Sequence, residues 1–351
     1  MNPIGNSRKP SLAGLATLTP RTLGAAAPDL VRQRPLNDHD RLPLLVEPAR
    51  PGVDLIAWVR ATRQALDALL GQHGGILFRG FDIPSTERFE ELVAAAGGEA
   101  LEYRERSSPR SAVAGRIYTS TDYPPDQPIF LHNENSYAHT WPRKILFFCQ
   151  TEPTRGGETP IADVRRVHDL IPDEVRMRFR ARGVLYVRNF SDAVGLSWPT
   201  VFQTSDRAAV EAQCRHSGYE IEWLPDNRLR TRRFGPAILE HPRTGEPVWF
   251  NHATFFHVST LPEPVRRGLL DLFPEEDLPN NTYYGDGKPI EPEVLDLLRE
   301  AYRTATVSFS WRAGDVLLLD NMLVAHGRAP YAGPRKVLVG MAEPVTVEDL
   351  R

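Results

Sequence analysis

The stretch "DVLLLDNMLVAHGRAPYAGPRKVLV", residues 315–339, decides the fold class. Two strongly apolar runs, 315–321 and 335–343, flank the turn-forming "GRAPYAGP", and a third run, "TVSFSW" at 306–311, precedes them across the turn "AGD". Three successive strands with such short connections favour an antiparallel sheet, because parallel strands need a long crossover. We therefore predict an antiparallel sandwich or jelly roll that carries helices on one face, an α+β fold.

Helical patterns occupy much of the remaining chain. Apolar residues at helical spacing, Ser/Thr caps and terminal glycines predict helices over 53–72, 85–98, 164–182, 207–218, 263–272 and 291–303. Residues 1–45 show no clear periodicity, and we expect them to form a partly irregular N-terminal arm. The prediction is one domain over 46–351 with a long helical insert at about 164–305.

Composition excludes several classes of partner. The net charge is −3, from 42 basic and 45 acidic residues, which argues against nucleic-acid binding and against a polybasic membrane anchor. No apolar run is long enough to span a membrane, and the first 20 residues lack the apolar core of a signal peptide. The two cysteines, Cys149 and Cys214, offer no disulfide framework, so we expect a cytoplasmic protein.

A candidate metal-binding pattern lies in "FLHNENSYAH", residues 130–139. In extended backbone His132 and Glu134 leave the same face, so both side chains can approach one point. A third ligand is needed, and His326, which follows the apolar run 315–321 in the chain, is the best candidate. Two histidines and a carboxylate form the facial triad that leaves positions open on Fe(II). By itself a His-x-Glu triplet is weak evidence, since a lone histidine is more often a hydrogen-bonded core residue.

Further features strengthen the metal hypothesis. Thr159, in "RGGETP", follows His132 by 27 residues (159 − 132), and Arg335 follows His326 by nine (335 − 326). An arginine at that point can form a bidentate pair with a dicarboxylate while a threonine hydroxyl donates beside it. A zinc hydrolase is disfavoured, because there is neither a cysteine-rich zinc pattern nor an obvious general base.

Four segments together carry a family resemblance. "LHNENSYAHTWPRKILFFC", "GGETPIADVR", "GLSWPTVFQT" and "WRAGDVLLLDNMLVAHGR" resemble the taurine dioxygenase and clavaminate synthase-like family of Fe(II)/2-oxoglutarate-dependent oxygenases, and within it the syringomycin-type hydroxylase branch. The resemblance covers roughly 76–344. It implies a double-stranded β-helix core and the cofactors Fe(II), 2-oxoglutarate and O2.

The resemblance also assigns roles to residues. It implies that the iron ligands are His132, Glu134 and His326. It implies that Thr159 and Arg335 hold the distal carboxylate of 2-oxoglutarate. Lys336 and Arg328 remain alternatives to Arg335, because the spacing from the last ligand is commonly longer in the family; bidentate geometry favours Arg335.

The resemblance limits the reaction. Related halogenases lack the carboxylate ligand, so Glu134 favours hydroxylation of an unactivated C–H bond, with desaturation, epoxidation and cyclisation as neighbouring outcomes. "VLVGM" lacks the arginine of sulfonate-binding members, which makes a taurine-like substrate doubtful. We expect an amino-acid-like substrate, free or tethered to a carrier protein, in specialised metabolite (antibiotic) biosynthesis.

Other predictions concern contacts and alternatives. Asn133, Tyr137 and Asn251 are candidate substrate contacts. The basic run "RLRTRRF", 228–234, is expected to be a solvated face, with docking of an acidic carrier protein as the alternative. Exposed helices in the insert leave room for a homo-oligomer. The rival from another class is a jelly-roll protein that binds a small molecule without catalysis.

Overall fold

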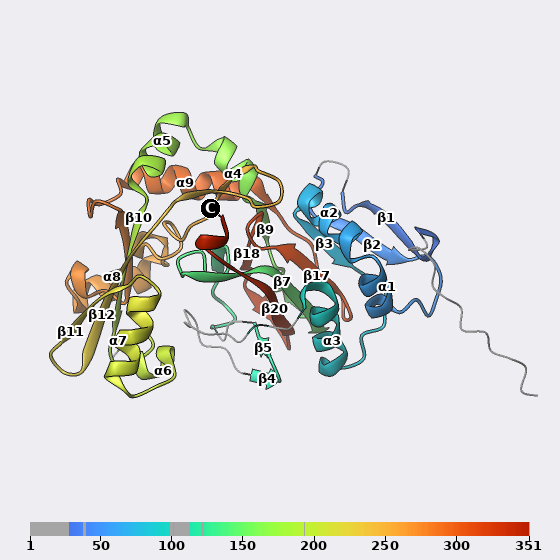
Figure 1. Cartoon of the computed structure of the whole chain (residues 1–351), viewed down its shortest axis with the longest axis horizontal. Coiled ribbons are helices and arrows are strands. Elements are labelled where there is room, and N and C mark those ends of the chain that lie inside the picture. Colours follow the sequence, from blue (N-terminus) through green and yellow to red (C-terminus); the bar gives the residue numbers. More distant parts are fainter. Residues whose placement is uncertain are drawn as a thin grey trace, which may run out of the picture.

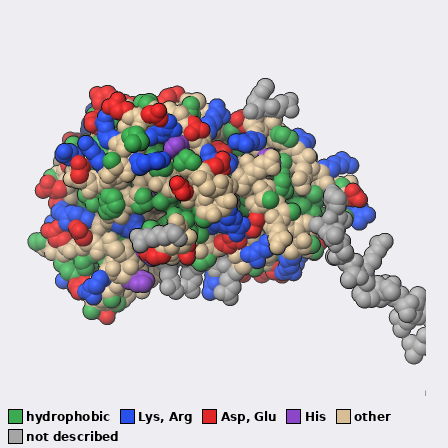
Figure 2. Space-filling model, turned by 45° about the horizontal axis from the view of Figure 1, so that its top comes forward, with side chains coloured by type: hydrophobic (Ala, Val, Ile, Leu, Met, Phe, Trp, Pro, Cys, Tyr) green, Lys and Arg blue, Asp and Glu red, His purple; other side chains and the backbone are tan. Residues whose placement is uncertain are grey.

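The structure is a computed structural model that describes residues 28–37, 40–98, 101, 112–120, 123–192 and 194–350. Within these ranges, none of the helices combines the length and the apolar character needed to cross a bilayer. On the face shown in Figure 2, basic and acidic side chains are interspersed. The described chain forms sheets with helices packed against them, the α+β content that the sequence predicts.

The largest sheet has eight strands. In spatial order they are β1 (Val31–Pro35), β2 (Leu44–Pro48), β3 (Gly75–Phe78), β17 (Val316–Asp320), β7 (Thr140–Thr151), β20 (Lys336–Thr346), β5 (Ile117–Thr119) and β4 (Ala112–Ala114). β7 pairs antiparallel with both β17 and β20, which sets Leu146 opposite Leu318 and Gly340. Both leucines are fully buried, and burying each contributes about 2 kcal/mol.

A second sheet has four strands and contains the candidate ligands. Its order is β16 (Thr306–Val307), β9 (Ile161–Asp163), β18 (Val324–Arg328) and β6 (Ile129–His132). The C-terminal strands β17, β18 and β20 therefore alternate between the two sheets, as expected for a sandwich. A short ladder of β8 (Arg155–Gly156) with β19 (Tyr331–Ala332) lies beside the connection into β20.

Three helices cover one face of the large sheet (Figure 1). They are α1 (Leu55–Ala61), α2 (Arg63–His73) and α3 (Thr86–Gly97). The start of α3 is fixed by Ser85 Oγ, which accepts a hydrogen bond from Arg88 N (3.3 Å), and its end by Gly98 at φ 83°. Buried Phe89 stacks on Phe148 of β7 with ring centroids 5.3 Å apart, so the helix is attached to the sheet by aromatic packing.

The insert builds a separate sheet on the side opposite the N-terminal strands (Figure 1). Its strands are β11 (Glu220–Leu224), β12 (Arg228–Gly235), β10 (Val184–Phe190) and β15 (Asn280–Tyr284), and β13 (Ile238–Glu240) pairs with β14 (Pro247–Trp249). The helices of this region are α4 (Val164–Leu170), α5 (Asp173–Arg182), α6 (Trp198–Phe202), α7 (Arg207–His216), α8 (Glu263–Leu272) and α9 (Pro292–Ala305).

The basic run 228–234 differs from its prediction. It forms β12, in which half-buried and buried side chains alternate up to the exposed Phe234, because one side of the strand packs on the insert core. Arg230 pairs with Asp277, and Arg232 with Glu222 at 3.1 Å. Arg233 is buried and donates to the carbonyl of Tyr137 (2.7 Å). These charges are satisfied within the chain, so the structure gives no support to carrier docking here.

Several predicted boundaries also differ. The helix expected at 53–72 is interrupted at Thr62, whose hydroxyl donates to the carbonyl of Trp58 (2.8 Å), and the helix expected at 164–182 is interrupted at Pro172. The expected arm, residues 1–45, contains β1 and the start of β2, and β2 pairs parallel with β3, because "LLVEP" supplies buried apolar side chains. Residues 1–27 and 38–39 of the arm lie outside the described residues.

Candidate metal centre

Strand register brings the two histidines together. His132 is the last residue of β6, and its Cα partner across the antiparallel ladder is His326 of β18. Cross-strand partners project to the same face within side-chain reach, and the two rings lie with centroids 4.6 Å apart. Gly327 permits this close approach, because a Cβ there would lie 2.6 Å from the carbonyl oxygen of Ile129.

Glu134 reaches the same point by a different route from the one predicted. It lies in a turn after β6 instead of in extended backbone, and Asn135 continues that turn at φ 55°, a left-handed conformation that asparagine tolerates. Asn321, between β17 and β18, holds the turn. Its Oδ1 accepts from Glu134 N (2.7 Å), while its Nδ2 donates to the carbonyls of Glu134 (2.9 Å) and Pro142 (2.8 Å).

The three side chains suit one metal ion. One ligand atom from each of His132, Glu134 and His326 lies within 4.8 Å of the others, and His326 Nε2 is 3.9 Å from Glu134 Oε2. The carbonyl of Phe130 accepts a hydrogen bond from His132 Nδ1 (2.9 Å), which leaves the lone pair of the neutral ring on Nε2. This orienting contact is common among metal-binding histidines, and the donor set of two imidazoles and one carboxylate fits Fe(II).

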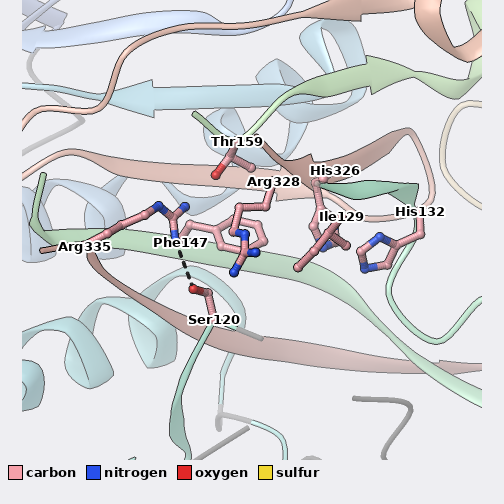
Figure 3. A pocket seen from close by; sticks show the side chains of 9 residues that line it. Ser120, Ile129, His132, Phe147, Thr159, His326, Arg328 and Arg335 are labelled. Atoms are coloured by element: carbon pink, nitrogen blue, oxygen red, sulfur yellow. Dashed lines mark hydrogen bonds between the residues drawn. The ribbon is translucent and has the colours of Figure 1, made fainter. Parts of the chain in front are cut away.

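A narrow cavity of about 30 Å³ extends from the two histidines to Arg335. Figure 3 shows Arg335 at one end of this cavity, His132 at the other and Thr159 along its wall. Trp311 Nε1 donates to Thr159 Oγ1 (3.1 Å), so the threonine proton is available for another acceptor. Ile129, Phe147 and Ser120 also line the cavity.

Arg335 presents a desolvated cation to this cavity. Its Nε donates to the carbonyl of Gly157 (2.9 Å) and its Nη1 to Ser120 Oγ (3.2 Å), both neutral acceptors. Within the described ranges no carboxylate forms an ion pair with it. Burial, assisted by the nearby Arg328 charge, lowers the pKa of Arg335 to about 10. An arriving carboxylate would offset that cost of burial.

The two alternatives to Arg335 lie in different settings. Lys336 begins β20 and is exposed. Arg328 lines the cavity, but its guanidinium donates to the carbonyls of Tyr123 (2.9 Å), Pro124 (2.6 Å) and Gln127 (2.9 Å). Arg328 therefore uses its guanidinium to hold the backbone of 123–127, and the geometry favours Arg335 as the anion-binding group.

A larger cavity of about 270 Å³ meets the other side of His132. Its walls come from β6, from the loop after β14 and from α8, with Phe130, Phe255, Leu269 and Asn280 among the lining residues. The Phe255 ring stacks on His132 with centroids 4.3 Å apart. Because His132 and Ile129 line both cavities, the two spaces meet at the metal centre.

The three predicted substrate contacts are absent from the described lining of both cavities. Asn133 is fully buried and donates to the carbonyl of Asn321 (2.7 Å). Asn251 uses both ends of its amide on backbone, donating to Ala237 O (2.8 Å) and accepting from Ala253 N (2.9 Å). Tyr137 packs behind the wall, 4.8 Å from the Phe256 ring. These side chains shape the backbone that surrounds the cavities.

Some residues of the site were not predicted from the sequence. Phe147 lies 5.0 Å from the His326 ring, yet in "ILFFC" it resembles any core aromatic. Ser120 carries no sequence signal, because its role depends on Arg335 approaching from a distant strand. Asn321 did leave a signal: the polar pair "DN" directly ends a fully buried strand.

Comparisons with known proteins identify the family. Residues 37–342 match the family described as "Taurine catabolism dioxygenase TauD, TfdA family". The dapdiamide synthesis protein DdaC of Enterobacter agglomerans is 42% identical over 280 residues, covering 80% of this chain and 85% of that protein. A clavaminate synthase-like protein of Arabidopsis thaliana is 32% identical over 295 residues (81% and 86%), and the tyrosine isonitrile desaturase of Pseudomonas aeruginosa is 24% identical over 321 residues (86% and 88%).

Solved structures show the same fold. PvcB, described as an Fe, alpha-ketoglutarate dependent oxygenase from an isonitrile synthetic pathway, superposes with a TM-score of 0.54 at 19% identity, over 91% of this chain and 95% of that one. A taurine dioxygenase from Burkholderia xenovorans gives a TM-score of 0.52 at 18% identity, over 91% and 92% of the chains. At these identities the likeness concerns the fold alone.

Proposed function

The chain belongs to the TauD/TfdA family of dioxygenases, and from this premise we propose that it is an Fe(II)- and 2-oxoglutarate-dependent oxygenase that hydroxylates an unactivated C–H bond of an amino-acid-like molecule. The observation that carries the proposal is one continuous space. It begins at His132 and His326 and ends at a half-buried arginine that has no carboxylate partner within the described ranges. The two ends of that space, metal ligands and a guanidinium, are the groups that a keto acid with a second carboxylate needs.

Each part of the site has a role in this proposal. His132, Glu134 and His326 hold the iron, and Thr159 and Arg335 bind the distal carboxylate of 2-oxoglutarate. When bound, Fe(II) and 2-oxoglutarate together activate O2, with the keto acid giving up CO2 and two electrons as it becomes succinate. The protein orients both molecules and, through the apolar walls, keeps water away from the reacting atoms.

Relatives support the substrate class and the setting. Two of them are named for making specialised metabolites, dapdiamide and an isonitrile, and one acts on a tyrosine derivative. Desaturation is the second candidate outcome, favoured by the relative named as a desaturase. Epoxidation and cyclisation use the same cofactors, and Glu134 disfavours halogenation.

The proposal extends to organisation and location. We assign a single oxygenase domain to 46–351, with a double-stranded β-helix core formed by the two sandwiched sheets and an insert at about 164–305. Membership of the syringomycin-type branch, a carrier-tethered substrate and a homo-oligomer stay predictions. A cytoplasmic location is supported by two cysteines that are both buried and unpaired.

Neighbouring residues provide a matched test. Arg335→Ala should weaken 2-oxoglutarate binding about 30-fold, the equivalent of ~2 kcal/mol for a hydrogen-bonded charge pair, and should slow succinate formation at low 2-oxoglutarate. Lys336→Ala removes an equal charge one position away on an exposed side chain and should change neither quantity. The proposal fails if both variants bind 2-oxoglutarate like the wild type, or if the wild type does not bind it.

A further inference from the structure

The larger cavity has a wall chemistry that limits what can enter it. None of its described lining residues is Lys, Arg, Asp or Glu. Most are aromatic or aliphatic, and Phe130, Phe255 and Leu269 represent its three walls. A charged group that enters such a space loses its hydration and finds no charged side chain in the described lining to pair with, which costs far more than burying an apolar group.

The polar group best placed to direct a ligand here is neutral. Arg188 lies behind the wall, with its guanidinium carbon 5.8 Å from the centre of the Phe256 ring, and its Nε donates to Asn280 Oδ1 (3.3 Å). This contact fixes the orientation of the Asn280 amide, because only its oxygen can accept. The Nδ2 group is then the end that can donate to a ligand, and a neutral carbonyl is a suitable acceptor.

The other polar lining groups have less to offer. Thr260 Oγ1 donates to the carbonyl of Thr254 (2.6 Å) and accepts from Arg299 Nη1 (3.1 Å), so its proton is already used. The Tyr123 hydroxyl lies 3.5 Å from Gln127 Oε1, at the limit of a hydrogen bond. The cavity therefore combines extensive apolar contact with one oriented amide donor.

We propose that this cavity receives an uncharged part of the substrate, an aromatic or branched apolar group next to a neutral carbonyl such as an amide or thioester. The inference rests on the proposed function, because it places the target C–H bond beside His132. It separates two forms of an amino-acid-like substrate. A free zwitterion is excluded from the cavity, while an acylated or amidated form is accepted.

A matched series of ligands tests the charge requirement. We choose 3-phenylpropanamide, 3-phenylpropanoate and L-phenylalanine, which share a carbon skeleton and differ in charge. Binding is measured by calorimetry on the full chain with Mn(II) in place of Fe(II) and with saturating 2-oxoglutarate, so that Arg335 is already occupied. The amide should bind at least about tenfold more tightly than the other two, a conservative factor for an unpaired buried charge.

Two positions on α8 provide the matched variants. Leu269 lines the cavity, whereas Leu272, in the last turn of the same helix, is 73% exposed. Leu269→Asp places a carboxylate in the wall. The aspartate side chain is too short to extend its charge into water, as a lysine could, so the variant should weaken amide binding by at least about tenfold. Leu272→Asp makes the same chemical change in solvent and should leave amide binding unchanged.

The outcomes separate this inference from the proposed function. It is overturned if 3-phenylpropanoate or L-phenylalanine binds as tightly as the amide, if the amide does not bind, or if the two α8 variants weaken amide binding equally. Binding of 2-oxoglutarate to both α8 variants is measured alongside and should match the wild type. Normal 2-oxoglutarate binding with a reversed ligand preference would leave the oxygenase proposal intact and remove only this one.

Discussion

Replacing Asn321 with alanine should loosen the turn that carries Glu134. The Asn321 side chain makes three hydrogen bonds to buried backbone groups, two on Glu134 and one on Pro142. At about 1 kcal/mol for each bond, the variant should lose about 3 kcal/mol of unfolding free energy. Because Glu134 is then positioned less firmly, Mn(II) affinity should fall by about tenfold or more, as for residues that orient metal ligands.

A control variant separates positioning from stability. The Asn189 side chain also makes three hydrogen bonds, donating to the carbonyls of Glu276 (2.9 Å) and Leu278 (2.7 Å) and accepting from Arg230 Nε (2.8 Å), but it belongs to the insert sheet. Asn189→Ala should lower stability by a similar amount and leave metal affinity unchanged. The measurements are urea unfolding of the metal-free proteins and Mn(II) titration. Equal Mn(II) affinities for the two variants would refute the positioning role of Asn321.

Two further predictions concern the framework. Gly327→Ala should destabilise the protein by about 2 kcal/mol or more in urea unfolding, because its Cβ would press on the carbonyl oxygen of Ile129 at 2.6 Å; stability within error of the wild type would contradict the register given for β18. Asp67→Asn tests a buried ion cluster. Burial alone would raise the pKa of Asp67, but its contacts with Lys144 and Arg243 outweigh that effect and lower it. The folded-state pKa lies below the unfolded value, so this contribution is present above pH of about 4 and is lost as the pH falls further. The unfolding free energy of the variant should fall less steeply below pH of about 4 than that of the wild type. An identical pH dependence in this range would contradict the lowered pKa of Asp67.

The sequence predicted an element correctly where caps, apolar spacing and a stop residue all indicated the same helix. The helix at 85–98 has a serine cap, an apolar face and a glycine stop, and α3 follows that prediction closely. The helix at 53–72 has an equally regular pattern but is interrupted, because the Thr62 hydroxyl competes for a backbone carbonyl. Such competition depends on geometry within one turn, and periodicity does not record it.

The strand predicted for "TVSFSW" at 306–311 is longer than the one in the structure. Only Thr306–Val307 pair as β16, although Phe309 and Trp311 remain buried. Burial gives these residues the same apolar signature as a ladder strand, so sequence cannot tell the two apart. His326 shows the opposite limit, a strand that does not look like one in the sequence. The sequence predicts His326 after a strand and before a turn, whereas the structure places it within β18, whose five residues include a glycine and an arginine.

Candidate site residues were predictable where chemistry required a rare residue type. Histidine, glutamate and arginine at fixed spacing identified the groups that the structure brings to one space. The residues that hold them, such as Asn321 and Ser120, were not predicted, because their roles arise from pairings across more than 180 positions. The apolar cavity was not predicted for the same reason, because its walls come from distant parts of the chain.

The most direct test of the central claim is the spectrum of the iron complex. Under anaerobic conditions, the wild type given Fe(II) and 2-oxoglutarate should develop a weak visible charge-transfer band, and His132→Ala should abolish it. His139→Ala is the control, since His139 lies in the same segment but pairs with Glu348 (3.0 Å) away from the triad, and it should retain the band. An undiminished band in His132→Ala, or no band in the wild type, would contradict the account.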